Sequence, residues 1–209
     1  MTRQRVRIRF SKQGDLRFIG HRDLARTFER WFRRAGVRLA MSQGFHPKAK
    51  MSFPAALGLG IAGVREVMEF ELAEPFDAER LRQQLAVHAP PGLTVSDLRL
   101  LAPGEGKARA RTATYEIRIP EPAQRRVHER VRHMIEQSSF WIERAGRGAP
   151  VDVKAGLDDL QFAEGVLRFR LTLDRAHGVR PQEVLQALEV QGLEREGCFL
   201  TRTELELAP

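Results

Sequence analysis

The chain has 209 residues, a hydrophobic content of 42%, a charged content of 30% and a formal net charge of +8. This composition is typical of a folded globular protein and excludes an intrinsically disordered chain. A single cysteine, Cys198, excludes an internal disulfide and any metal or iron–sulfur site built from several cysteines. No apolar run approaches the roughly 18 residues that a membrane span needs, so we expect a cytoplasmic protein without a membrane partner.

The positive charge is concentrated near the N-terminus. Residues 1–50 hold 14 Lys and Arg against 3 Asp and Glu, whereas residues 51–101 hold 4 against 7. Residues 102–209 are balanced, with 17 of each. Positive charge clustered in this way predicts a surface that binds a polyanion.

The first half of the chain begins with a strand and a helix. Over residues 5–10, the apolar residues Val6, Ile8 and Phe10 alternate with arginines, which is typical of a half-buried strand whose second face carries guanidinium groups. Residues 21–35 form an amphipathic pattern with an apolar stripe opposite five arginines, which predicts a helix. The other expected elements are strands over 37–41, 50–57, 64–72 and 93–101 and a helix over 77–88 with Asp77 as its N-cap.

The second half repeats this order after a stretch without apolar periodicity. We expect residues 102–112 to be a linker between a basic domain of residues 1–101 and a second domain of residues 113–209. The fold class predicted for the whole chain is α+β, with two tandem ferredoxin-like (βαββαβ) halves and antiparallel sheets. The second half is expected to have strands over 114–119, 140–143, 151–153, 166–173 and 198–207 and helices over 122–137 and 181–189.

The segment 11–24 is the first candidate for binding. It leads from a strand through a glycine turn into a helix, and the free amides at a helix N-terminus suit a phosphate group. The alternative is that Gly14 and Asp15 form an ordinary turn and Asp23 is an ordinary first-turn carboxylate. The basic and histidine side chains of this segment are Lys12, Arg17, His21 and Arg22.

The segment 42–53 is the second candidate. Gly44 and Pro47 restrict its backbone, so Phe45 and His46 are expected on a loop where burial is hard to arrange. Aromatic residues beside lysines suit stacking on an unpaired base together with a phosphate contact. The alternative is that Phe45 fills an edge of the core and His46 is a polar surface residue. The neighbouring lysines are Lys48 and Lys50.

Motifs for catalysis or metal binding are missing from the sequence. It has no Gly-x-Ser-x-Gly, no P-loop and no Rossmann glycine pattern, and its histidines lack metal-ligand spacing, so we expect neither a metal nor a cofactor. His21 and His46 remain candidates for a general acid–base pair that would cleave RNA. Three further carboxylates, Glu66, Glu69 and Glu71, are expected on an acidic solvent-facing surface, and the alternative is that Glu69 and Glu71, on one face, bind a cation. An irregular stretch is expected to hold Asp152, Asp158 and Asp159.

Several ordered stretches of the sequence resemble the radical-SAM-associated (radical-SAM-linked) proteins, a bacterial domain of unknown function. The resemblance rests on residues 6–24 (Val-Arg-Ile-Arg-Phe-Ser-Lys-x-Gly-Asp-Leu-Arg-Phe-Ile-x-His-x-Asp-Leu), Arg30, and residues 33–36, 42–48 and 57–60. The chain departs from the family pattern at Gly20, where a serine is usual, and at Arg22, where a leucine is usual. The family loop also typically runs Pro-His-Pro-Lys, whereas residues 47–50 here are Pro-Lys-Ala-Lys.

The resemblance implies a partner, sometimes a fused one, of a cobalamin-binding radical S-adenosylmethionine (SAM) enzyme. Because this chain has no Cys-x-x-x-Cys-x-x-Cys, the iron–sulfur cluster would belong to that partner. The favoured hypothesis is therefore an RNA-binding accessory protein that presents tRNA or rRNA to the radical SAM enzyme, without DNA specificity. The alternatives are an RNA-acting enzyme, either a nuclease or a pseudouridine-synthase-like protein, and a protein-only adaptor for the radical SAM enzyme. The residues expected to contact nucleic acid are Arg7, Arg9, Lys12, Arg17, His21, Arg22, Arg26, Phe45, His46, Lys48 and Lys50.

Overall fold

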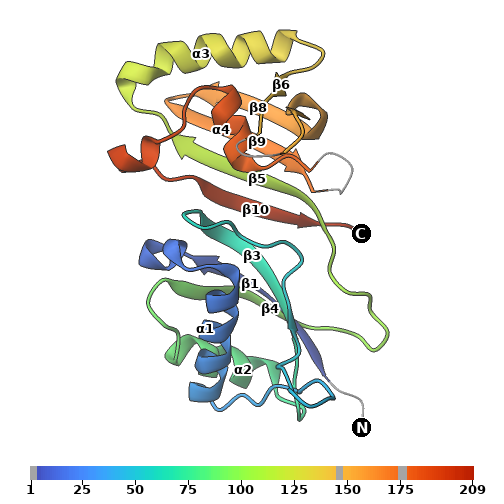
Figure 1. Ribbon diagram of the computed structural model, residues 1–209. Helices are drawn as coiled ribbons and strands as arrows, with labels where there is room; N and C mark the ends of the chain where they lie inside the picture. The colour runs from blue at the N-terminus through green and yellow to red at the C-terminus, as the bar shows by residue number, and fades with distance from the viewer. Residues whose placement is uncertain (1–3, 145–147, 174–177) are drawn as a thin grey trace. The chain divides into compact units, whose positions relative to one another are not determined.

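The computed structural model describes residues 4–144, 148–173 and 178–209 (Figure 1). The chain divides into two compact units, the first Met1–Arg109 and the second Ala110–Pro209. In the described residues, each unit combines two α-helices with antiparallel strands, so the predicted α+β class is confirmed. Across those same residues, no helix is both long enough and apolar enough to cross a membrane.

The first unit is built on a sheet with the strand order β4-β1-β3. Strand β1 pairs antiparallel with both neighbours, and the short strand β2 pairs with β3. Glu69 on β3 lies opposite Arg7 of β1 and opposite Ser52 of β2. The bounds are Arg5–Lys12 for β1, Met51–Ser52 for β2, Ala62–Glu71 for β3 and Leu93–Leu100 for β4.

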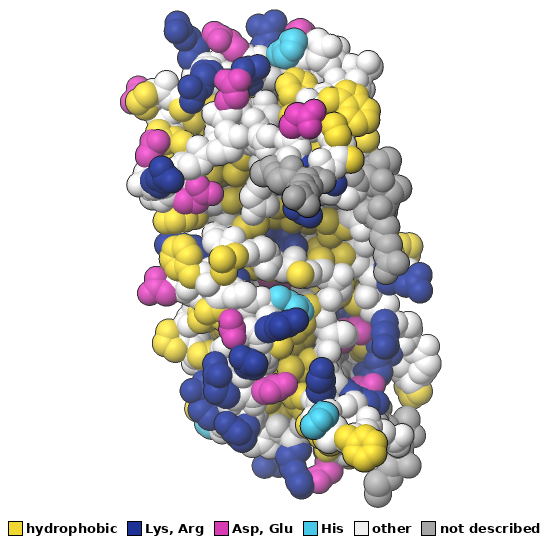
Figure 2. Space-filling view, viewed as in Figure 1, with side chains coloured by type: hydrophobic (Ala, Val, Ile, Leu, Met, Phe, Trp, Pro, Cys, Tyr) yellow, Lys and Arg dark blue, Asp and Glu magenta, His cyan; other side chains and the backbone are white. Residues whose placement is uncertain are grey.

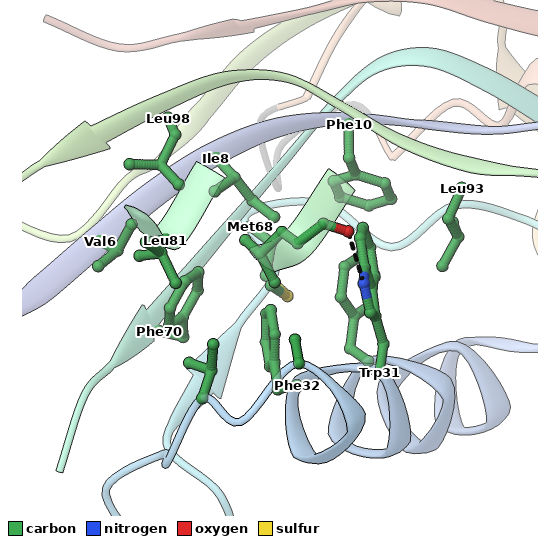
Figure 3. Close-up of a cluster of buried hydrophobic side chains, with 14 of the residues drawn as sticks. Val6, Ile8, Phe10, Trp31, Phe32, Met68, Phe70, Leu81, Leu93 and Leu98 are labelled. Carbon is green, nitrogen blue, oxygen red and sulfur yellow. Dashed lines mark hydrogen bonds between the residues drawn. The ribbon is translucent and has the colours of Figure 1, made fainter. Parts of the chain in front are cut away.

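Two helices, α1 (His21–Arg34) and α2 (Ala78–Val87), pack against the sheet of the first unit. The alternating residues Val6, Ile8 and Phe10 of β1 are buried, as the sequence pattern predicts, and they form one core cluster with the apolar stripes of both helices (Figure 3). Trp31 of α1 is fully buried, and its Nε1–H donates to the backbone oxygen of Leu85 at 3.0 Å.

The ends of these helices follow the local sequence. The side chain of Asp77 accepts a hydrogen bond from the backbone nitrogen of Arg80 at 2.8 Å, so it caps α2 as predicted. Gly36 follows α1 with a φ of 68°, a backbone conformation that favours glycine and ends the helix. A 3-10 helix, η1 (Gly14–Phe18), connects β1 to α1.

In the described residues of the second unit, four strands form a sheet with the order β10-β5-β9-β8. All of the pairs in this order are antiparallel. Two short strands, β6 (Trp141–Ile142) and β7 (Val151–Asp152), form a separate pair. The remaining bounds are Ala110–Arg118 for β5, Leu157–Ala163 for β8, Val166–Thr172 for β9, Thr201–Leu207 for β10, Glu121–Glu136 for α3, Pro181–Ala187 for α4, Lys154–Gly156 for η2 and Leu193–Glu196 for η3.

Two strands expected in the first unit are shorter than the sequence predicts. The strand expected over 37–41 is reduced to isolated bridges, Leu39 with Leu72 and Met41 with Ala49. The strand expected over 50–57 is reduced to β2, which ends two residues before Pro54. Proline has no N–H to donate to a strand ladder, so it opposes continuation of β2.

The prediction of an irregular stretch around Asp158 and Asp159 is wrong, because both residues lie in β8. This strand is at one end of the strand order of its unit, and its polar residues break the usual alternation of apolar residues. Glu164 and Gly165, at φ values of 52° and 73°, form the tight turn between β8 and β9. The expected linker, 102–112, also overlaps β5, which begins at Ala110.

Candidate nucleic-acid interface

The segment between β1 and α1 presents an aromatic ring beside a guanidinium group. The guanidinium carbon of Arg17 lies 4.4 Å from the centre of the Phe18 ring, and Nη1 of Arg17 donates to the backbone oxygen of Gly14 at 3.1 Å. The Phe18 side chain is exposed although it is apolar. An exposed ring beside a cation can stack on an unpaired base while the cation meets a phosphate.

The two candidate segments of the sequence meet in the structure. The ring of His21, at the start of α1, contacts the ring of Phe53 edge-on with centroids 5.0 Å apart. Phe53 in turn contacts the buried rings of Phe10 and Phe28, at centroid distances of 6.2 and 5.8 Å. The exposed His21 is therefore supported by the core, at the point where the segments 11–24 and 42–53 come together.

The loop between Met41 and Lys50 is held at its base by the main chain. Ser42 donates its backbone N–H to the oxygen of Lys48 at 2.8 Å, and the N–H of Lys48 returns to the Ser42 hydroxyl at 2.9 Å. Gly44 has a φ of 122°, which favours glycine. Phe45 at the loop tip is fully exposed and His46 is exposed beside it, so the alternative that Phe45 fills the core edge is wrong.

A hollow of about 340 Å³ lies beside this loop, within the first unit. Lys50 lines it and forms an ion pair with Glu71 of β3, with Nζ and Oε2 2.9 Å apart. The residues that line the hollow are Arg5, Ser42, Lys48, Ala49, Lys50, Met51, Ser52, Glu69, Phe70, Glu71 and Lys107.

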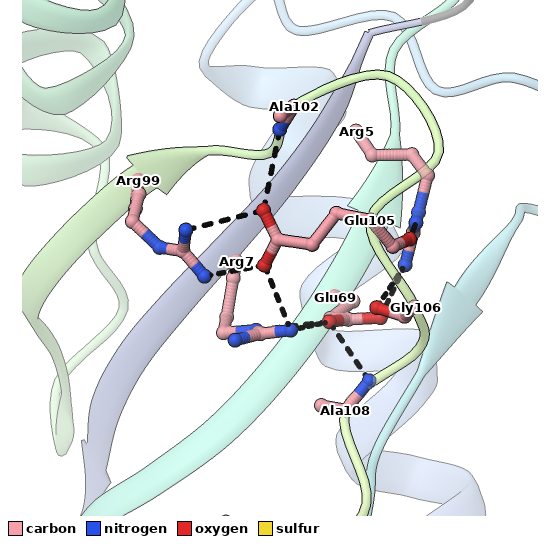
Figure 4. A network of polar contacts seen from close by, with 8 residues as sticks. All are labelled: Arg5, Arg7, Glu69, Arg99, Ala102, Glu105, Gly106 and Ala108. Carbon is pink, nitrogen blue, oxygen red and sulfur yellow. Dashed lines mark hydrogen bonds and ion pairs between the residues drawn. The ribbon is translucent and has the colours of Figure 1, made fainter. Parts of the chain in front are cut away.

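The arginines of β1 are engaged with carboxylates (Figure 4). Glu69 accepts hydrogen bonds from Nη2 of Arg5 at 2.9 Å and from Nη2 of Arg7 at 2.7 Å. Glu69 is also almost fully buried, so the expectation that it belongs to a solvent-facing acidic surface is wrong. The Arg7 side chain is 18% exposed, which leaves little of it for a nucleic acid.

Glu105 holds the segment that follows β4 (Figure 4). Its carboxylate accepts hydrogen bonds from both terminal nitrogens of Arg99, at 2.6 and 3.2 Å, and from the backbone nitrogen of Ala102 at 3.3 Å. The Arg99 hydrogen bond is the largest cause that lowers the pKa of Glu105; desolvation opposes it, and the backbone of Ala102 and the charge of Arg7 add to it. This carboxylate therefore favours its charged form in the folded chain.

Two further predicted contacts have their own intramolecular partners. Lys12 is 1% exposed, and its ammonium group donates to the backbone oxygen of Ile19 at 3.2 Å. A long cation in this position supports the η1 turn from inside rather than presenting charge at the surface. Arg9 donates to the backbone oxygen of Arg65 at 3.3 Å and remains half-buried.

The outer face of α1 is strongly basic. Figure 2 shows Lys and Arg side chains gathered over the region of the first unit where α1 lies. Arg26 is 3.5 Å from the Asp23 carboxylate, an exposed pair that is weak in water. Arg30 donates to the Thr27 hydroxyl at 3.0 Å. The exposed arginines of this helix are Arg22, Arg26, Arg30, Arg33 and Arg34.

The two histidines suggested for catalysis are not paired. In the described part of the chain, no hydrogen bond or ring contact joins His21 to His46. Residues 4–144, 148–173 and 178–209 also contain no group of three or more His, Cys, Asp or Glu that could hold a metal ion. The structure instead presents exposed rings near cations at two places, Phe18 against Arg17 and Phe45 on the loop that carries Lys48.

The family model described as "Uncharacterized protein conserved in bacteria (DUF2344)" matches residues 5–186. The chain belongs to this family. No curated protein matches the chain. Among solved structures, an unknown protein from Galdieria sulphuraria is similar over 100% of both chains, with 13% sequence identity and a TM-score of 0.31. Membership of this family confirms the bacterial domain of unknown function that the sequence resemblance implied.

The family match covers every residue proposed from the sequence to contact nucleic acid. Some residues of the candidate interface were not predicted from the sequence. Phe18 and Phe53 were not among the predicted contacts, although each lies in a candidate segment beside a cation or histidine. Glu71 and Lys107 line the hollow with Lys48 but are distant from it in sequence. No local pattern could have grouped these residues, because the pairing of β2 with β3 and the chain after β4 bring them together.

Proposed function

We propose that the chain is an RNA-binding accessory protein and that its first unit supplies the binding surface. The observation that carries this proposal is the fully exposed ring of Phe45, on a loop closed by two hydrogen bonds between Ser42 and Lys48. Exposing a phenyl ring to water is unfavourable unless a partner covers it. The flanking Lys48 and Lys50 favour an anionic partner with flat apolar groups, and RNA has both.

The arginines of α1 support the same partner. Arg22, Arg26 and Arg30 recur every four residues, so they follow one side of the helix and can meet successive phosphates. Phosphate contacts of this kind position a nucleic acid without reading its sequence. Stacking on Phe18 and Phe45 needs unpaired bases, which are the usual targets of RNA-binding proteins. We therefore propose tRNA or rRNA as the ligand, with no DNA specificity.

We also infer that both units are ferredoxin-like halves. In the first unit, β1 lies between the last strand, β4, and β3, with β2 beyond β3. In the second unit, β5 lies between the last strand, β10, and β9, with β8 beyond β9. A central first strand flanked in this way supports a split βαβ arrangement in each half.

The proposed partner is a cobalamin-dependent radical SAM enzyme in the cytoplasm. The support for this part is the sequence resemblance at residues 6–24 and 42–48, which are the same stretches that form the candidate interface. In this proposal the chain holds the RNA while the partner performs the modification. The exposed rings and cations hold a nucleic acid by stacking and charge, which requires no reacting group in this chain.

The proposal is tested by measuring RNA affinity as a function of salt. Purified protein is titrated into labelled tRNA and rRNA fragments at increasing potassium chloride concentration. We expect the logarithm of the affinity to fall linearly with the logarithm of salt, by about 0.7 to 0.9 for each phosphate neutralised. Crosslinking in cells should recover RNA on peptides from residues 10–23 and 42–53. Absence of RNA binding, together with nuclease-resistant co-purification with the radical SAM enzyme, would instead support a protein-only adaptor.

A further inference from the structure

The hollow beside β2 is large enough for one small ligand. Its volume, about 340 Å³, is at the low end of the range of roughly 300 to 1,000 Å³ for small-ligand sites. It can therefore hold one nucleotide of a longer strand. Ser42 and Lys48 line the hollow and also close the loop that carries Phe45, so a neighbouring nucleotide could reach that ring.

One part of the lining suits a phosphate and another suits a base. In the described part of the chain, the ammonium groups of Lys48 and Lys107 make no hydrogen bond or ion pair, and both side chains are exposed. Ala49 and Met51, both partly buried, are the apolar residues of the lining that keep some exposure.

The two carboxylates of the hollow differ in what a ligand can reach. The Glu69 side chain is 4% exposed and accepts hydrogen bonds from Arg5, from two nitrogens of Arg7 and from the backbone of Ala108. Glu71 forms its ion pair with Lys50, yet its side chain remains 26% exposed. Of these two carboxylates, Glu71 is therefore the one that a ligand in the hollow can reach.

A carboxylate that lines the hollow favours a ligand group that donates a hydrogen bond. A carboxylate accepts from the exocyclic amine of cytosine, whereas the O4 atom of uracil would bring a second acceptor against it. The two bases are otherwise nearly the same size.

We propose that this hollow binds one unpaired nucleotide whose base carries an exocyclic amino group. The phosphate lies near Lys48 and Lys107, the base lies within the hollow, and the amine donates to Glu71. This inference rests on the proposed RNA binding and adds a preference among bases to it. Cytidine is the most compact nucleotide that fits the description.

The test compares two single-stranded RNAs of about nine nucleotides, oligo(C) and oligo(U), by fluorescence anisotropy; this length is within the known range for single-strand binding sites. We expect oligo(C) to bind about five-fold more tightly, the lower end of what one base contact contributes. In Glu71→Gln the preference should fall below about two-fold, because an amide can also donate to uracil. The matched control is Glu74→Gln, since Glu74 is exposed and pairs with Arg38, outside the hollow.

The variant should fold, because the main chain of Glu71 makes its own hydrogen bonds. Its N–H donates to Lys50 at 3.0 Å, and its oxygen accepts from Ala40 at 2.8 Å. If Glu71→Gln were nonetheless unfolded, titration of the unchanged protein with cytidine and uridine monophosphates would give the same comparison. The double variant Lys48→Ala and Lys107→Ala should lower the affinity for oligo(C) and for oligo(U) by the same factor, because a phosphate contact does not depend on the base.

The outcomes separate this inference from the proposed function. Equal affinity for oligo(C) and oligo(U), with salt-dependent RNA binding intact, overturns the base preference alone. A preference for oligo(C) that survives in Glu71→Gln overturns the assignment to Glu71. Failure of the protein to bind any RNA overturns both proposals.

Discussion

The imidazole of His21 and the phenyl ring of Phe53 meet edge-on, with centroids 5.0 Å apart and an angle of 80° between the ring planes. His21 begins α1, whereas Phe53 directly follows β2. The contact therefore joins two segments that are about thirty residues apart in the chain. Because Phe53 also contacts Phe28 of the core, the histidine is held in a defined place at the surface.

His21→Ala should weaken RNA binding without changing the integrity of the RNA. We expect a loss of about two- to five-fold, which corresponds to one modest polar contact. The measurement is affinity for labelled tRNA, followed by electrophoresis of total RNA incubated with the protein. The control is His88→Ala, whose side chain lies beyond the end of α2. RNA cleavage by the unchanged protein that disappears in His21→Ala would favour an RNA-acting enzyme.

Phe45→Ala should weaken binding of single-stranded RNA and leave the stability of the protein unchanged. The ring is fully exposed, so its removal creates no cavity, and stacking on one base contributes about 1 to 3 kcal/mol. Affinity is measured by anisotropy and stability by thermal unfolding. Val87→Ala is the control, because Val87 is another exposed apolar residue, at the end of α2. Equal affinity of the Phe45→Ala variant and the unchanged protein would remove the main support for the proposed interface.

Neutralising the outer face of α1 should reduce the salt dependence of RNA binding. In the triple variant Arg22→Gln, Arg26→Gln and Arg30→Gln, the slope of log affinity against log salt should fall by about 2, if each arginine meets one phosphate. A matched triple variant in α3 replaces Arg125, Arg126 and Arg132, which are also exposed helix arginines. A larger effect of the α3 variant would place the RNA on the second unit.

The sequence was most informative where one face of an element is buried. The alternation of Val6, Ile8 and Phe10 predicts β1, and the apolar stripe around Trp31 predicts α1, because each pattern has the period of its element. Strand β8 was missed because its residues are mostly polar or partly exposed, which leaves no clear alternation. The one feature of the sequence that could have indicated β8 is the turn Glu164-Gly165, which joins it to β9.

The candidate site was predictable as segments but not as an assembly. The loop with Phe45 could be expected from Gly44 and Pro47, since these residues restrict a backbone locally. Whether a cation is free depends instead on residues distant in sequence. Arg7 is engaged because the register of β1 with β3 places Glu69 opposite it. Lys12 is buried because the η1 turn brings the backbone oxygen of Ile19 to its ammonium group, and the strand pattern of residues 5–10 does not show that turn.

Replacement of Trp31 by phenylalanine should destabilise the first unit. The last carbonyls of a helix lack partners within it, and the Trp31 Nε1–H donates to one of them, the oxygen of Leu85. Loss of this donor and of buried volume should cost about 2 to 4 kcal/mol in the free energy of unfolding. Urea unfolding followed by circular dichroism measures this change in the free energy of unfolding. The control, Trp141→Phe, changes an exposed indole and should stay within about 0.5 kcal/mol.

The ion pair of Glu105 with Arg99 should make stability depend on pH at acidic values. Because the pKa of Glu105 is lowered on folding, mainly by the Arg99 hydrogen bond, its contribution is fully present above its ordinary value of 4.5. That contribution is lost as the pH falls through the lower pKa of the folded chain. Glu105→Gln should therefore destabilise the protein near neutral pH and bring it closer to the unchanged protein in acid. Urea midpoints across this range, with Glu129→Gln as the control, measure the difference. A gap between Glu105→Gln and the unchanged protein that widened in acid would contradict the assignment.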